Sequence, residues 1–196
     1  MTTICTIAHV LSVAIALAAA GSSGAAAQER GAWVHENTTA NLQRLMETVH
    51  RKLHVERSVA QGAALFRSLV PDEARATRAL RDDVAPGVVQ KVVQTFQAFA
   101  ALGDAEFINL MRPVQSVVRV RGATTEEIGE YREGSIPYEH FPSATQRVAK
   151  QLLRPGVTFY EVEFLEPKQT RGIKYHLFYW DGQRWAMLGP VWRALE

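Results

Sequence analysis

Cysteine is almost absent from this chain of 196 residues, and the single cysteine, Cys5, lies close to the N-terminus. From Gln28 onward the sequence therefore offers no disulfide bond, no thiolate metal site and no cysteine nucleophile. Dense clusters of basic residues are also absent, and the net charge is only +2. We therefore expect no nucleic-acid partner, because surfaces that bind nucleic acid concentrate lysine and arginine on one face.

Common catalytic motifs are missing as well. The chain has no nucleophile elbow, phosphate-binding loop, metalloprotease motif or dinucleotide-binding fingerprint. His50 and His54 are four residues apart on a predicted helix, with Glu47 one turn earlier, but a zinc site needs three or four convergent ligands. The sequence therefore predicts a surface helix there, no metal or cofactor, and no catalytic residue. An acid–base pair stays open, because two residues leave almost no trace in a sequence.

The first 27 residues contain no Lys, Arg, Asp or Glu, and they are mostly apolar from Ile4 to Ala20. Small residues precede Gln28, as they do at a signal-peptidase site, although the usual basic start is missing. The apolar run is also short for a membrane-spanning helix. We expect residues 1–27 to be a signal peptide and the mature protein to be periplasmic or secreted, without an integral membrane segment. An uncleaved anchor is the alternative.

Helical periodicity dominates residues 37–111, where apolar side chains recur at three- and four-residue steps. Residues 28–85 are expected to form a helical extension, and Pro86 to open a longer helix that ends at Gly103 in a left-handed conformation. Three pairs have the spacing of a capping box, which is a residue that caps a helix start and a Glu or Gln three positions later. These pairs are Ser58 with Gln61, Thr124 with Glu127, and Ser143 with Gln146.

Strands are predicted at residues 114–120 and around residue 162. Glu161 and Glu163 alternate with apolar neighbours, which is typical of a strand with one buried face, so both glutamates should point outward. Residues 134–142 are expected to form a loop, from which Glu139 and His140 could reach the mouth of a pocket.

The segment from Tyr175 to Leu195 is the most informative part of the chain. Asp181 and Gly182 lie between two aromatic runs, which favours a hairpin with a two-residue loop. Such a loop would pair Phe178 with Trp185, and it would leave both faces of the hairpin mainly apolar. An antiparallel hairpin with one wet side has a polar face, so something should cover each side here. We expect the protein's own helices on one side, and a helical arm, a second subunit or a ligand on the other.

The order of elements from Pro86 is a long helix, a short helix, a strand, one or two helices and a three-stranded meander. This order, with GDAEFINLMRP after the long helix and DGQRW in the last hairpin, resembles the nuclear-transport-factor-2-like (cystatin-like) superfamily over about residues 86–196. The resemblance implies a curved sheet wrapped around helices, with a pocket inside the resulting cone. It also implies that a homodimer can form through the outer sheet face, and that enzymes of the superfamily hold an acid–base pair inside the cone.

The expected fold class is α+β, with an N-terminal helical segment followed by a curved antiparallel sheet packed on helices. We expect a non-catalytic protein that binds a small apolar ligand or a protein partner through the aromatic-rich sheet. The side chains expected to contact a ligand are Tyr160, His176, Phe178, Trp180 and Trp185. The alternative is a small lyase or isomerase that uses His176 with a carboxylate, but outward-pointing Glu161 and Glu163 would form no such pair.

Overall fold

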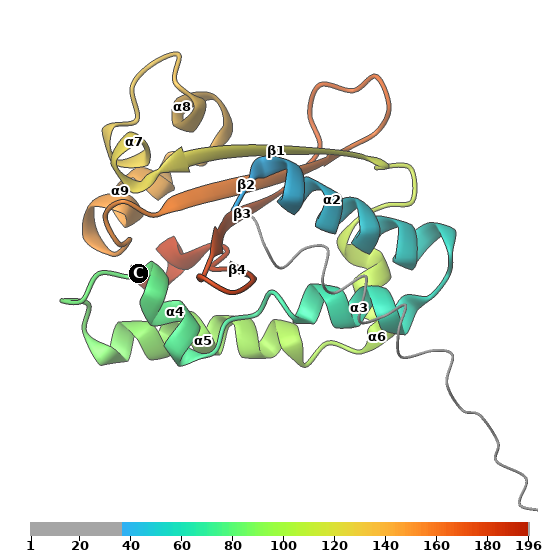
Figure 1. Ribbon diagram of the computed structural model, residues 1–196, viewed down its shortest axis with the longest axis horizontal. Coiled ribbons are helices and arrows are strands. Elements are labelled where there is room, and N and C mark those ends of the chain that lie inside the picture. The colour runs from blue at the N-terminus through green and yellow to red at the C-terminus, as the bar shows by residue number, and fades with distance from the viewer. Residues whose placement is uncertain (1–36, 196) are drawn as a thin grey trace, which may run out of the picture.

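The computed structural model describes residues 37–195 and shows a four-stranded antiparallel sheet with helices packed on it (Figure 1). The strands lie in the order β1-β2-β3-β4, with β1 at Val117–Thr124, β2 at Thr158–Leu165, β3 at Ile173–Trp180 and β4 at Trp185–Met187. The predicted fold class, α+β with a curved antiparallel sheet packed on helices, is confirmed. The predicted signal peptide and the leader up to residue 36 lie outside the described residues.

Three α-helices form the N-terminal part of the described chain. They are α2 (Thr39–His50), which continues into a π-helix (Arg51–Val55), then α3 (Val59–Arg67) and α4 (Glu73–Ala79). The side chains of Thr38 and Asp72 cap α2 and α4, because each accepts a hydrogen bond from a backbone N–H in the first turn. Ser58 makes no such bond at the start of α3, and Ser143 makes none at the start of the helix Ala144–Gln151, so the caps predicted at these two positions are wrong.

The remaining helices are α5 (Pro86–Ala100), α6 (Asp104–Phe107), α7 (Thr125–Glu130), α8 (Ile136–His140) and α9 (Ala144–Gln151), with 3-10 turns at Ile108–Leu110 and Val191–Leu195. The capping box of Thr124 and Glu127 at the start of α7 is confirmed. Gly103 has a φ of −63° and precedes α6, so the predicted left-handed ending is wrong. The loop predicted at residues 134–142 is wrong in part, because it contains α8, which Ser135 caps.

Different helices cover the two faces of the sheet. On one face, here called the α2 face, Val162, Phe178 and Trp185 pack with α2, α3, α6 and the C-terminal half of α5. On the opposite face, here called the α9 face, Leu177 and Tyr179 pack with α4, α7, α9 and the N-terminal half of α5. Figure 1 shows α5 passing beneath the strands, so that one helix serves both layers. The prediction that both apolar faces of the hairpin are covered is confirmed, and helices of the same chain cover them.

The N-terminal helices belong to the same core as the sheet. Side chains of α2 and α3 share one apolar cluster with β1, β2, β3 and β4. The described part of the helical extension predicted at residues 28–85 and the domain predicted from residue 86 thus share one apolar core. The boundary between them stays a prediction. Within residues 37–195, no helix has both the length and the apolar character needed to cross a membrane.

The loop between β3 and β4 has four residues, so the two-residue loop predicted from the sequence is wrong. Trp180 pairs with Trp185, and Phe178 pairs with Met187. The side chain of Asp181 accepts hydrogen bonds from the backbone N–H groups of Gln183 and Arg184, both at 2.9 Å, and this holds the wider loop. Gly182 has a φ of +97°, the conformation for which glycine was expected there.

A β-bulge in β3 changes which side chains share a face. The register shifts between the pairs Tyr160–Phe178 and Val162–Tyr175, so two residues of β3 lie opposite Glu161. One of them, Leu177, has a φ of +58° and is fully buried. The extra residue interrupts the alternation of the strand, and His176 therefore lies on the α9 face, opposite to Phe178.

Candidate functional site

The five side chains predicted to contact a ligand do not form one site. Tyr160, Phe178, Trp180 and Trp185 lie on the α2 face, where they pack in the core. The ring of Trp185 is 5.2 Å from the ring of Tyr160 and 5.4 Å from that of Trp180. His176 lies on the α9 face. The structure thus brings four of the predicted residues together as packing partners and separates the fifth from them.

On the α9 face, acidic and basic side chains of β1, β2 and β3 lie next to one another in two rows that run across the strands. In the first row, Arg119 of β1 lies opposite Glu163 of β2, which lies opposite Lys174 of β3. In the second row, Arg121 of β1 lies opposite Glu161 of β2, and the bulge brings His176 of β3 to the same glutamate. Each glutamate therefore lies between basic side chains on both neighbouring strands.

Glu161 forms a pair with His176, contrary to the expectation from alternation. One carboxylate oxygen of Glu161 is 3.0 Å from Nδ1 of His176, and the other is 2.7 Å from Nζ of Lys174. The Glu161 side chain is only 2% exposed, so these two partners compensate for the loss of water around a buried charge. Glu163 accepts a hydrogen bond of 2.8 Å from the backbone N–H of Gly172. Both glutamates point away from the apolar cluster of the α2 face, as alternation predicted, but the expectation of one exposed face is wrong, because β2 is buried on both faces and the glutamates with it.

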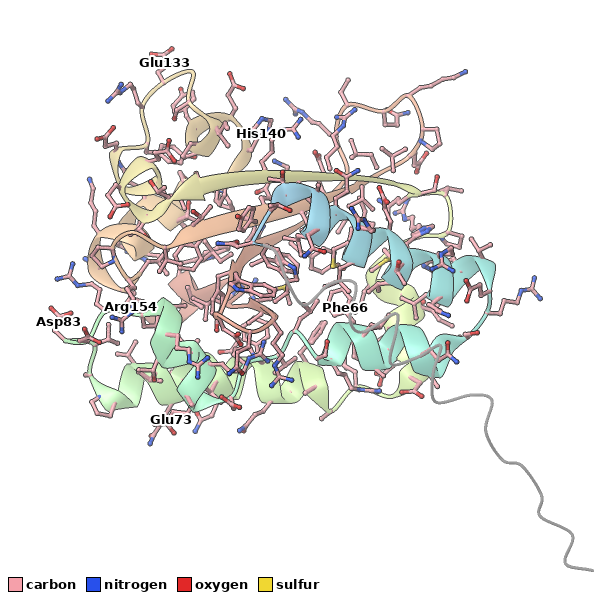
Figure 2. All side chains as sticks on the ribbon, in the orientation of Figure 1. Phe66, Glu73, Asp83, Glu133, His140 and Arg154 are labelled. Carbon is pink, nitrogen blue, oxygen red and sulfur yellow. The ribbon has the colours of Figure 1, made fainter. Side chains whose placement is uncertain are left out.

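These rows form the floor of a cavity of about 550 Å³, here called the charged groove. Its lining residues are Arg119, Arg121, Glu139, His140, Glu161, Glu163, Thr170, Arg171, Gly172 and Lys174. Helix α8 and the loop between β2 and β3 rise on this side of the sheet (Figure 1), and Figure 2 shows His140 at α8. Nζ of Lys174 donates a hydrogen bond of 2.8 Å to the carbonyl oxygen of His140, which ties α8 to the floor of the groove.

Among residues 37–195, three arginines in the groove have no carboxylate partner. Arg119 and Arg171 form no ion pair with any residue in the described part of the chain, and Arg121 bonds only to the carbonyl oxygen of Val120. Both oxygens of Glu161 already have partners in Lys174 and His176, whereas Glu163 accepts one hydrogen bond, from the backbone N–H of Gly172. The guanidinium groups are therefore available to an anion.

His176 lies beside the groove and not in its lining. The ring lies 5.5 Å from the ring of Trp192, and its Nδ1 is the atom that contacts Glu161. The side chain of His176 is 18% exposed. A ligand in the groove would thus touch Glu161 or Lys174 before it touched His176.

The histidine pair on α2 and the π-helix is not the surface feature predicted from the sequence. His50 is 5% exposed, and its Nε2 lies 3.4 Å from the carbonyl oxygen of Arg112. The rings of His50 and His54 are 4.8 Å apart, while Glu47 bonds to Gln43. In the region from residue 37 to 195, no group of three or more His, Cys, Asp or Glu side chains could hold a metal ion.

Sequence reasoning missed the basic residues of the groove. Arg119 and Arg121 alternate with valines, as Glu161 and Glu163 alternate with apolar residues, so the two strands carry complementary patterns. That pattern could have indicated one charged face. Arg171 lies in a loop, and nothing in its neighbourhood indicates that it faces the same cavity. Glu139 and His140 do reach a pocket, but from α8 rather than from a loop.

Comparison with known proteins gives no assignment. No model of a protein family, no curated protein and no solved structure matches the chain. The resemblance to the nuclear-transport-factor-2-like superfamily therefore stays a prediction, and functional inference depends on the charged groove.

Proposed function

We propose that this protein is a non-catalytic binding protein that holds a small anionic molecule in the charged groove. The observation that supports this most is the convergence of Arg119, Arg121 and Arg171 on one cavity without carboxylate partners among residues 37–195. A volume of about 550 Å³ suits a small molecule, because such sites typically enclose about 300–1,000 Å³. Guanidinium groups bind carboxylate and phosphate through paired hydrogen bonds, so an anion is the matching ligand.

This ligand differs from the apolar one that the sequence led us to expect. The aromatic side chains that would hold an apolar ligand are packed against one another and against helices on the α2 face. The α9 face of the same hairpin is covered by other helices. The charged part of the α9 face, above β1 and β2, is where the structure leaves a groove. A ligand can reach the charged side chains of this groove, whereas the aromatic side chains are packed in the core.

Calorimetry with a panel of small carboxylates and inorganic phosphate tests the proposal. We expect Arg119→Gln and Arg121→Gln to weaken binding of the best anion by about 10- to 100-fold, since a hydrogen bond to a charged group contributes roughly 1.5–3 kcal/mol. Arg147→Gln is the matched control, because Arg147 is exposed on α9 and does not line the groove. If no anion binds, or if all three variants bind like the parent, the proposal is wrong.

A second candidate is an acid–base enzyme, because Glu161 and His176 are within hydrogen-bonding distance. Two observations favour binding over catalysis. His176 does not line the groove, and both oxygens of Glu161 already have partners in the fold. We therefore expect His176→Asn to retain its affinity for the anion. A substrate that the parent converts and this variant does not would favour the enzyme instead.

We also propose that the protein is exported, on the basis of the apolar, uncharged residues 1–27. The expected mature N-terminus is Gln28. N-terminal sequencing of the protein recovered from the producing cell tests this. Protein that retains residues 1–27 would contradict cleavage.

A further inference from the structure

We infer that the ligand of the charged groove is a small dicarboxylate that spans β2, an inference that rests on the proposed function. The first reason is the balance of charge. Four cationic side chains line the groove: Arg119, Arg121, Arg171 and Lys174. Two buried carboxylates, Glu161 and Glu163, oppose them and leave two positive charges. The third acid, Glu139, has a side chain that is 58% exposed and lies near His140; with its charge counted as well, the lining still carries one net positive charge.

The second reason is where the charges lie. The basic residues stand on both sides of β2, with Arg119 and Arg121 on β1, and with Lys174 on β3 and Arg171 in the loop before it. The carboxylates of Glu161 and Glu163 lie between them, on β2 itself. A compact anion centred over β2 would meet these two negative charges. A ligand with one carboxylate at each end and an uncharged middle avoids that repulsion.

The size of the groove agrees with such a ligand. Strands β1 and β3 are two strand spacings apart, which is about 10 Å. Arginine side chains are long and flexible, so they can shorten this span from both sides. A dicarboxylate with a short carbon chain then reaches a guanidinium at each end. Each end can form the paired hydrogen bonds that arginine makes with a carboxylate.

The test compares the affinities of succinate and adipate with those of butyrate and inorganic phosphate by calorimetry. We expect the better dicarboxylate to bind at least about tenfold more tightly than butyrate, because only it uses cations on both sides of β2. The preference should disappear in Arg171→Gln, which removes the partner of the second carboxylate. The control Arg147→Gln should keep it, and circular dichroism should show that all variants are folded.

The possible outcomes distinguish a failure of the dicarboxylate inference from a failure of the proposed anion binding. If butyrate binds as tightly as the dicarboxylates, the groove binds anions but the dicarboxylate inference is wrong. If phosphate binds more tightly than either dicarboxylate, the inference that the ligand carries one carboxylate on each side of β2 is wrong, while the proposal that the groove binds an anion stands. If none of the four compounds binds the parent, both this inference and the proposed function fail.

Discussion

Replacing Arg75 with methionine should remove the contact that joins α4 to the loop between β3 and β4. Nε of Arg75 lies 2.5 Å from a carboxylate oxygen of Asp181, and the two side chains are only 7% and 2% exposed. The same guanidinium donates a 2.6 Å hydrogen bond to the carbonyl oxygen of Trp185, and bonds of 3.1 Å to those of Ser68 and Val70. One side chain thus connects α3, α4 and the hairpin.

The expected loss of unfolding free energy is about 3–5 kcal/mol, the usual effect of removing one partner from a buried ion pair. Methionine fills similar space but donates no hydrogen bond, so Asp181 would keep a buried charge without its guanidinium. The carbonyl oxygens of Trp185, Ser68 and Val70 would also lose a donor, which acts in the same direction. Since domains are stable by only about 5–15 kcal/mol, the effect should be easy to measure.

The loss should also depend on pH. Burial alone would raise the pKa of Asp181, but the N–H groups of Arg184 and Gln183 and the guanidinium of Arg75 outweigh it, and the pKa is lowered. A lowered pKa means that the ionised carboxylate stabilises the fold at neutral pH, and that this contribution is lost as the pH falls through the folded-state pKa. The difference between Arg75→Met and the parent should therefore shrink as the pH falls below the ordinary value of 3.8.

Urea unfolding followed by tryptophan fluorescence and by circular dichroism measures this loss at pH 7. Arg132→Met is a suitable control, because the ion pair of Arg132 with Glu130 has side chains that are 77% and 60% exposed. Exposed pairs contribute at most about 1 kcal/mol, so the control should stay close to the parent. A loss below about 1 kcal/mol for Arg75→Met would refute the view that this buried pair holds α4 to the sheet.

Three further predictions use the same unfolding assay. Gly182→Val should lose about 1–3 kcal/mol, because Gly182 has a φ of +97° and a β-branched residue is strained there; stability equal to the parent would contradict the loop geometry. Gly189→Ala should lose more, because its φ is +56° and the new Cβ would clash with Cζ of Phe96; an unchanged midpoint would show that the contact relaxes freely. The pKa of His54 is lowered from 6.5 by burial, with a further effect from His50. The unfolded state then binds the proton more readily, so stability should fall as the pH drops below that value, and His54→Gln should reduce this slope; parallel pH profiles would contradict the assignment.

Much of the local structure follows from the sequence because local chemistry decides it. Thr124 and Glu127 satisfy the first N–H groups of α7 within one turn, so the capping box is visible in four residues. The alternation around Glu161 and Glu163 predicts β2 and the face on which these acids lie, but not that both faces of the strand are buried. The two apolar faces of the final hairpin likewise required cover on both sides, and the structure provides it from helices of the same chain.

The candidate site, in contrast, depends on features that only the tertiary structure determines. Leu177 adopts a φ of +58° although nothing in its type favours that conformation, and its burial among α4, α5 and α9 accompanies the bulge. The bulge then places His176 beside Glu161, a pairing that strict alternation forbids. Arg171 shares a groove with Arg119 and Arg121 because antiparallel pairing brings segments about 50 residues apart to one face. Capping and alternation act over a few residues and can be recognised in the sequence, whereas register, bulges and the meeting of distant charges are fixed by packing of the whole chain.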